Sequence, residues 1–198
     1  MPVAWSLDTM GFFCRTVQDA VVMLACLAEH DPKDPVSLAA PAFDFVQGLG
    51  AEAAPPRIAM PRRFFYEKAD GDVRERTDAV VERLAASGAS VEEIGLEADF
   101  DALAAAHRTI MSVEAAAVHE RDFSARADDY APKVRGLIES GMLVPAVSYV
   151  RAQRVRGAFR REMDQAMRGF DAVLSPTTPA PAPRDLTTTG DPVFQIPW

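Results

Sequence analysis

The stretch FDAVLSPTTPAPAP, residues 170–183, decides how the chain folds, because a short apolar run there stops in a proline-rich loop. The run Ala172–Leu174 predicts a strand that is covered on both faces, as in parallel or mixed α/β sheets. Prolines have no backbone N–H, so the sheet cannot continue through the loop. Open α/β sheets bind ligands beyond the carboxyl ends of their strands, which predicts that Pro176 and Thr177 line a pocket. The alternative is that the loop only turns the chain.

Composition limits the classes of protein that the chain can belong to. Its 198 residues, 48% of them hydrophobic, suit one domain with an ordinary core. A net charge of −8 argues against nucleic-acid or anionic-membrane partners, which need a cationic face. Cys14 and Cys26 are too few for a disulfide framework and have no CxxC spacing, and no apolar run reaches the roughly 18 residues of a membrane span. We therefore expect a cytoplasmic protein.

Between residues 57 and 94 the sequence predicts a strand, a helix and a second strand. The strands are Arg57–Met60 and Ala89–Ile94, and the helix is Asp72–Ser87 with Gly88 as its stop. A crossover of this length joins parallel strands with a right-handed connection. The inward residues expected on this helix are Val73, Val80, Val81 and Leu84.

Apolar residues at helical spacing predict four further helices, at 16–29, 100–122, 132–141 and 145–168. In the first, Thr16 with Asp19 resembles a capping box, and Cys26 is interpreted as a small buried side chain. The second should bury Leu103, Ala106, Ile110, Val113 and Ala117, and the last should bury Ala152, Val155, Phe159 and Ala166. In the last helix Arg154, Arg161 and Arg168 recur on the opposite side and are interpreted as a solvated face rather than a phosphate-binding ridge.

Two apparent motifs are rejected on their context. Residues 48–53 fit GxGxxA, but Pro55-Pro56 follows where a dinucleotide site needs a helix, so no nucleotide cofactor is expected. His107 and His119 lie on different faces of one helix, and no HExxH or clustered Cys/His spacing exists, so no metal site is expected.

Three segments together resemble the later part of an amidase-signature family enzyme. They are PVAWSLDTMGFFCRTVQDA at residues 2–20 followed by HDPKDP, the pattern YxxAxxxR at Tyr149, Ala152 and Arg156, and residues 170–183. The resemblance covers essentially the whole chain and implies an α/β fold in which a mixed sheet lies between helices on both faces. It also implies amide hydrolysis by a serine nucleophile paired with a second serine, held by a cis peptide, and a lysine.

The residues that this chemistry requires are absent from the chain. It contains no Gly-Gly and no Ser-Ser pair, and its lysines, Lys33, Lys68 and Lys133, fall in a turn, a turn and a helix start. We therefore assign no catalytic residue and expect residues 1–198 to be a single partial amidase domain, truncated at both ends. The chain is either a portion of an amidase that forms an acyl-serine intermediate, or a catalytically silent fragment or binding piece.

The resemblance also suggests where the complete enzyme would meet a small-molecule amide. The turn at residues 6–11 would lie beside the missing catalytic loop, which makes Asp8, Thr9 and Gly11 candidate pocket residues. Arg156 would hold a substrate carboxylate, as an arginine of a similar helix does in amidotransferase-like members; the alternative is that it only bridges two helices. The tyrosine and later aspartate of amidotransferases do not follow Gly190-Asp191-Pro192, which argues against glutamine. No nucleic-acid or membrane partner is expected, and a homodimer is left open.

Overall fold

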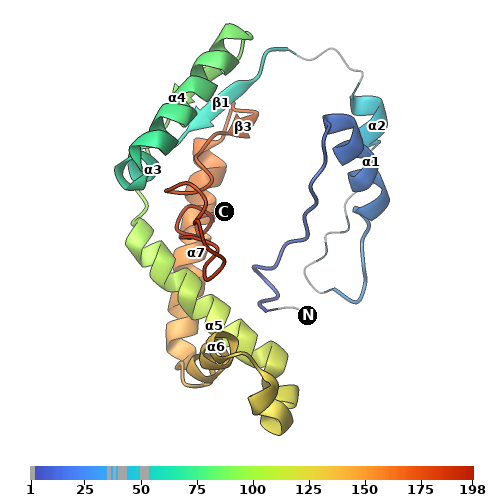
Figure 1. Ribbon diagram of the computed structural model, residues 1–198, viewed down its shortest axis with the longest axis vertical. Helices are drawn as coiled ribbons and strands as arrows, with labels where there is room; N and C mark the ends of the chain where they lie inside the picture. The colour runs from blue at the N-terminus through green and yellow to red at the C-terminus, as the bar shows by residue number, and fades with distance from the viewer. Residues whose placement is uncertain (1–2, 35–36, 38, 40–43, 50–53) are drawn as a thin grey trace.

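The computed structural model describes residues 3–34, 37, 39, 44–49 and 54–198 (Figure 1). Its helices are α1 (Val17–Leu27), α2 (Phe45–Gly48), α3 (Arg62–Lys68), α4 (Gly71–Ala86), α5 (Phe100–Arg126), the 3-10 helix η1 (Ala127–Asp129), α6 (Pro132–Met142) and α7 (Ala146–Ala166). Its strands are β1 (Arg57–Met60), β2 (Ser90–Glu93) and β3 (Ala172–Val173). The described part of the chain is therefore an α/β structure that is mostly helical. No helix within these ranges is long and apolar enough to cross a membrane.

The sheet has the order β2-β1-β3, and both neighbouring pairs are parallel. The parallel pairing of β1 with β2 across α4 confirms the predicted strand-helix-strand unit. Among the described residues the sheet has no antiparallel strand, so the mixed sheet that we expected is not seen there. β1 lies in the middle and buries Ile58, Ala59 and Met60.

The strand at residues 172–174 differs from its prediction. β3 is two residues long, Ala172 is exposed and Val173 is half-buried. The expectation of a strand covered on both faces was wrong, because β3 pairs with β1 at the edge of the sheet while the central strand takes the buried position. The proline loop does begin at the carboxyl end of β3, as predicted.

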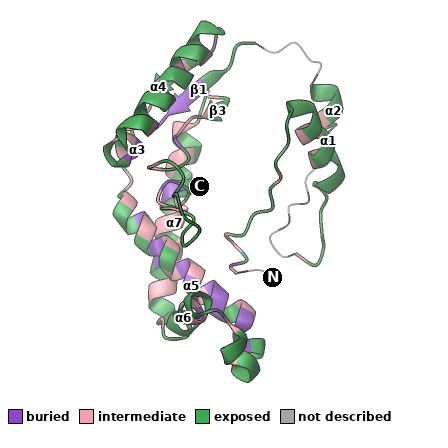
Figure 2. Cartoon of the chain, in the orientation of Figure 1, coloured by how far each residue is buried: buried purple, intermediate pink, exposed green. Residues whose placement is uncertain are grey.

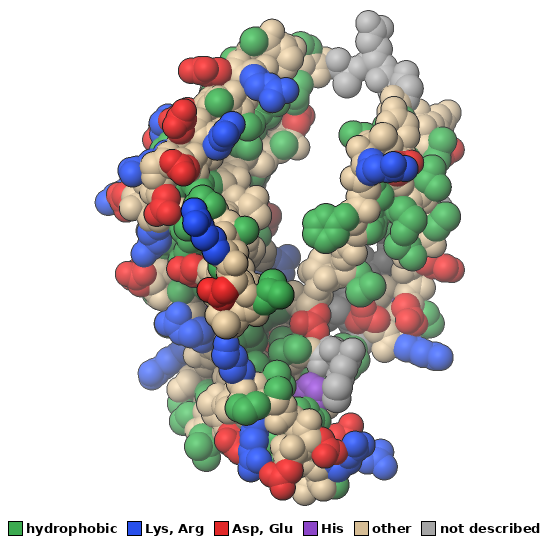
Figure 3. All heavy atoms as spheres, viewed as in Figure 1, with side chains coloured by type: hydrophobic (Ala, Val, Ile, Leu, Met, Phe, Trp, Pro, Cys, Tyr) green, Lys and Arg blue, Asp and Glu red, His purple; other side chains and the backbone are tan. Residues whose placement is uncertain are grey.

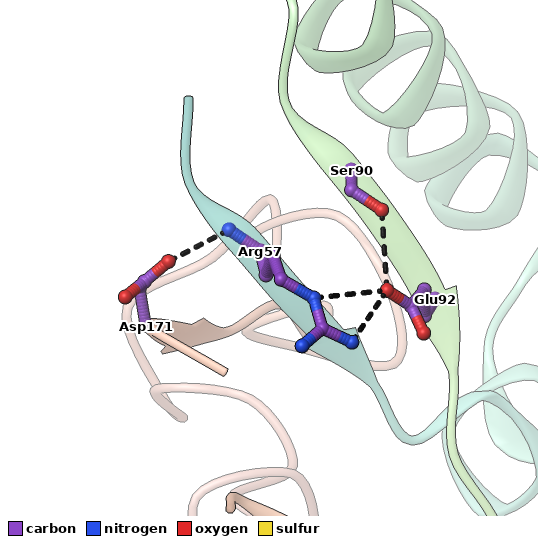
Figure 4. Close-up of polar contacts among 4 residues, drawn as sticks. All are labelled: Arg57, Ser90, Glu92 and Asp171. Carbon is purple, nitrogen blue, oxygen red and sulfur yellow. Dashed lines mark hydrogen bonds and ion pairs between the residues drawn. The ribbon is translucent and has the colours of Figure 1, made fainter. Parts of the chain in front are cut away.

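Polar contacts join the three strands at the ends where they begin (Figure 4). The amide of Arg57 donates to a carboxylate oxygen of Asp171 at 2.8 Å, and the amide of Asp171 donates to the Arg57 carbonyl at 2.8 Å. The Arg57 guanidinium donates to Glu92 at 3.0 Å, which holds the pKa of Glu92 below its usual range. The Arg57–Asp171 contacts lie at the end of the sheet opposite the proline loop, and the half-exposed Arg57–Glu92 pair joins β1 to β2.

The main helical core forms where α5 packs against α6 and α7 (Figure 1). α5 buries nine residues, and Figure 2 shows the buried positions concentrated on it and on β1. They are Leu103, Ala106, Ile110, Ser112, Glu114, Ala115, Ala116, His119 and Phe123. Ala117, which we expected inside, is exposed, because the buried face toward α6 continues through Ala115 and Phe123, which cluster with Ile138.

The first helix forms as predicted but buries no residue. The Thr16 hydroxyl accepts from the amide of Asp19 at 3.1 Å, which confirms the predicted N-cap. The main contact of α1 is the four-residue α2, so α1 stays largely exposed and carries apolar side chains on its surface (Figures 2 and 3). Val17 is 67% and Leu27 60% exposed. Cys26 is also exposed, so its interpretation as a buried side chain was wrong.

Two smaller differences concern α3 and α4. α3 was not predicted, and it places Lys68 at a helix end rather than in a turn. On α4, Thr77 is buried and Val80 is 41% exposed, because the helix turns Thr77 rather than Val80 toward the protein. The rejected GxGxxA pattern begins at the end of α2, and its residues 50–53 lie outside the described part.

Gly141 has a packing role that the sequence did not indicate. We predicted that it ends its helix, but α6 continues to Met142 and Gly141 is buried against α5. A Cβ atom built on Gly141 would lie 1.9 Å from the carbonyl oxygen of Ser112. The two helices can therefore approach this closely only because residue 141 has no side chain.

We predict that Gly141→Ala lowers the free energy of unfolding by about 1–3 kcal/mol, because the added methyl overlaps backbone that cannot move without separating α5 from α6. Gly136→Ala on the same helix is the matched control, since a Cβ there meets nothing within 4 Å. The control should be neutral or stabilising by about 0.5–1 kcal/mol. Urea titration of both variants measures the difference, and equal effects would contradict the close helix contact.

Candidate functional site

The candidate site begins with a tight turn near the start of the described chain. The amides of Leu7 and Asp8 donate to the carbonyl of Ala4 at 3.0 and 2.9 Å. The Asp8 carboxylate closes the turn by accepting from the amides of Val3 at 2.7 Å and Ala4 at 3.3 Å. The turn presents the backbone and the hydroxyl of Ser6 to α5.

A buried carboxylate on α5 receives this turn. Glu114 is 9% exposed. One of its oxygens accepts from the Ser6 amide at 2.9 Å, and the other accepts from the Ser6 hydroxyl at 2.6 Å and the Tyr149 hydroxyl at 3.1 Å. These three bonds offset the cost of removing a carboxylate from water. Glu114 therefore connects the turn to both α5 and α7.

The α7 side of the site is built by the YxxAxxxR pattern. Tyr149 and Arg156 are seven residues apart, which places them on one face of the helix, and Ala152 between them is buried against Ala106 and Ile110 of α5. A guanidinium N–H of Arg156 donates to the Ser6 hydroxyl oxygen at 2.6 Å. The small residue in the middle allows close helix packing. Of the polar residues at the two ends, Arg156 bonds to the turn and Tyr149 bonds to Glu114.

Gln153 completes this group by donating to the Tyr149 hydroxyl at 2.8 Å. Burial and the neighbouring Glu114 raise the pKa of Tyr149, while the bond from Gln153 opposes the shift. We call Ser6, Glu114, Tyr149, Gln153 and Arg156 the Glu114 network.

A cavity of about 410 Å³ lies beside the network. Its charged or titratable lining residues are Asp8, His107, Arg156 and Arg160, and its apolar ones include Trp5, Leu103, Ile110, Phe159 and Trp198. Burial lowers the pKa of His107, and the charge of Arg108 lowers it further, so the imidazole is neutral near pH 7. Two arginines against aromatic walls suit an anionic group carried on an apolar body.

The proline loop lines a second cavity, of about 560 Å³, against the first half of α4. Its walls include Pro176 and Thr177 from the loop, and Asp72, Arg76 and Thr77 from α4. The loop is held in place where the amide of Asp70 donates to the Pro179 carbonyl at 2.7 Å. The loop therefore lines a cavity that is separate from the one at Arg156, and a role of Pro176 and Thr177 in a substrate pocket stays a prediction.

The structure thus distributes the six predicted pocket residues over different places. Asp8 and Arg156 share one cavity, and Pro176 and Thr177 share the other. Thr9 and Gly11 are exposed and line neither. Asp8 uses its carboxylate to close its own turn, so its observed contacts are structural.

Sequence reasoning missed Glu114 and treated Ser6 only as part of a turn. The signal for Glu114 was present, since it is an acidic residue within the buried face that contains Ile110 and Ala115. A charged residue in such a position is normally paired when buried. Its partners could not be found, because Ser6 is 108 positions away in the sequence.

Nothing in the described residues indicates a metal site. They contain no group of three His, Cys, Asp or Glu side chains that could hold an ion. His119 is buried in the helical core, with a ring nitrogen 3.1 Å from the Tyr130 hydroxyl. The arginines at positions 154, 161 and 168 are exposed, and their interpretation as a solvated face stays a prediction.

Comparison with known proteins agrees with this architecture. An amidase of Pseudomonas putida is 34% identical over 182 residues, which are 92% of this chain and 39% of that protein. A glutamyl-tRNA(Gln) amidotransferase subunit of Pelobacter propionicus is 33% identical over 214 residues, covering 96% of this chain and 44% of that protein. A crystal structure of an amidase superposes with a TM-score of 0.75 at 27% identity, covering 95% and 39% of the two chains.

The fold and these relatives define an α/β protein of the amidase type. The Amidase family profile matches residues 1–195, and the chain belongs to this family. It spans about two fifths of the length of the relatives it matches.

We predict that Tyr149→Phe lowers the free energy of unfolding by about 1–2 kcal/mol, because it removes one of the donors to a buried carboxylate. Tyr66→Phe is the matched control, since the Tyr66 hydroxyl also donates to a carboxylate, Asp78, whose side chain is 46% exposed and can rebind water. The control variant should lose less free energy of unfolding than Tyr149→Phe. Chemical denaturation of both variants tests this, and an equal or smaller loss in Tyr149→Phe would contradict the burial of the network.

Proposed function

We propose that this chain is a portion of an amidase that hydrolyses a carboxylic amide to an acid and ammonia or an amine through an acyl-serine intermediate. In this proposal the chain supplies the wall of the substrate pocket. The observation that carries it is the Arg156 guanidinium, which is held by Ser6 at a cavity with aromatic walls. The family membership supplies the class of reaction.

The chain's own serines and lysines do not support catalysis by this part alone. Ser6, the serine of the Glu114 network, donates a hydrogen bond to Glu114 and accepts one from Arg156, so its hydroxyl is already used to hold the turn and the arginine. The lysines lie at positions 33, 68 and 133, and each is exposed. We therefore place the serine nucleophile, the bridging serine and the lysine outside this chain.

Arg156 is the residue proposed to recognise the substrate. A guanidinium binds a carboxylate with two parallel N–H groups, and the bond to Ser6 fixes one edge of the group in place. The cavity also contains Arg160, one helical turn further along α7. These contacts favour a small amide that carries a carboxylate on an apolar body.

The isolated 198-residue chain should release no ammonia from simple aliphatic or aromatic amides, because it cannot form an acyl-enzyme. Incubation with a fluorophosphonate, which labels activated serines, should likewise leave its intact mass unchanged. A full-length amidase serves as the positive control. Turnover or stoichiometric labelling that disappears on changing one of the chain's own serines would overturn the assignment of the nucleophile to another part of the protein.

A second test examines Arg156 in a complete amidase that carries this chain, for example one built on the Pseudomonas putida relative. Arg156→Lys should lower kcat/KM on carboxylate-bearing amides by about tenfold or more, because lysine cannot reproduce the two-pronged contact. Neutral amides of the same size should be affected much less, and Arg154→Lys on the exposed side of α7 is the control. Equal losses on both kinds of amide together with a lowered Tm would instead indicate a purely structural role.

A further inference from the structure

We propose that Glu114 is the positioning residue for Arg156 and acts on it through the Ser6 hydroxyl. The described contacts form a relay from the buried carboxylate to Ser6 and from Ser6 to the guanidinium. Its relevance to substrate binding rests on the proposed function of Arg156.

The direction of each hydrogen bond follows from the chemistry of Glu114. A carboxylate only accepts, so the Ser6 hydroxyl, 2.6 Å away, must direct its single proton toward Glu114. The remaining lone pairs of the Ser6 oxygen are then available to a donor, and an N–H of Arg156 occupies this position at 2.6 Å. The carboxylate thereby determines that Ser6 presents an acceptor to Arg156.

Glu114 also fixes the position of the Ser6 oxygen. Its second carboxylate oxygen holds the Ser6 backbone amide at 2.9 Å, so the residue is bound through its main chain and its side chain at once. The turn is held from its other end by the Asp8 carboxylate. The acceptor that Arg156 meets is therefore part of a rigid group rather than a rotating hydroxyl.

An amide at position 114 could not do the same work. Gln has the shape of Glu, but its NH₂ group is a donor and would face either the Ser6 amide or the hydroxyls of Ser6 and Tyr149. If it faced the hydroxyls, Ser6 would turn its proton toward Arg156, where two donors would meet. If it faced the Ser6 amide, that amide would lose its acceptor. In the first case Arg156 loses its fixed partner, and in the second case the turn loses its anchor.

The relay leaves most of the guanidinium available at the cavity. The bond to Ser6 uses one of the five N–H donors of Arg156, which also lines the cavity. Fixing one edge of the planar guanidinium also sets the orientation of its other edges. Less side-chain conformational entropy is then lost when a ligand binds to those edges. Glu114 does not itself line the cavity and reaches Arg156 only through Ser6, which is why we describe its role as positioning.

The experiment measures the rotation of the Arg156 guanidinium by NMR in the purified chain, with its signals assigned from Arg156→Lys. Glu114→Gln should make this rotation about tenfold faster, the factor expected when one hydrogen bond of ordinary net strength is lost. Ser6→Ala should do the same. Glu120→Gln, an exposed glutamate on the same helix, should leave it unchanged.

The double variant Ser6→Ala/Glu114→Gln distinguishes a relay from general loosening of the fold. If Glu114 acts through Ser6, the double variant rotates no faster than Ser6→Ala alone, whereas independent effects would multiply. Unchanged rotation in Glu114→Gln, or multiplied effects in the double variant, would overturn the proposal. If Glu114→Gln does not fold, Ser6→Ala alone tests the proposal. Unchanged rotation of the Arg156 guanidinium in the folded Ser6→Ala variant would also overturn the proposal. The measurement uses no substrate, so its outcome is independent of the carboxylate-binding role of Arg156.

Discussion

The buried carboxylate of Glu114 is the contact on which the candidate site depends. It accepts three hydrogen bonds from two segments that the sequence separates widely, the turn at Ser6 and the helix at Tyr149. Leaving a carboxylate buried with fewer partners costs more free energy than any single one of these bonds contributes. The contact is therefore also a constraint, because the turn, α5 and α7 must keep their relative positions for Glu114 to stay satisfied.

Close packing of α5 makes this arrangement feasible. At one point of the helix Gly141 lets α6 approach the Ser112 carbonyl, and nearer its start Ala106 and Ile110 pack against Ala152 of α7. Small residues at these crossings bring backbones close enough for short polar side chains to bridge them. The sheet plays a different part, since its loop after β3 forms a separate cavity against α4. The site at Arg156 is thus made by helix packing and a turn rather than by the edge of the sheet.

Local patterns in the sequence predicted much of the fold. The N-cap at Thr16, the helices from residues 71 to 166 and the parallel pairing of β1 with β2 all follow from residue spacing and capping chemistry. Burial was less predictable, because it depends on what packs against each element. Ala172 and Cys26 looked internal from their apolar surroundings but are exposed, since β3 lies at the edge of the sheet and α1 has mainly the short α2 beside it. Arg156 could be selected from the YxxAxxxR pattern, whereas the bond that orients it required knowing which residue lies opposite in space.

Amide hydrogen exchange at Ser6 tests this account most directly, because the Ser6 amide is bound by the carboxylate itself. We expect it to exchange markedly more slowly than the amides of the exposed residues Thr9 and Met10 in the same segment, and to lose that protection in Glu114→Ala, which has no side-chain acceptor. Exchange at Ser6 that is as fast as at Thr9 and Met10 in the unaltered chain would contradict the claim that Glu114 anchors the turn.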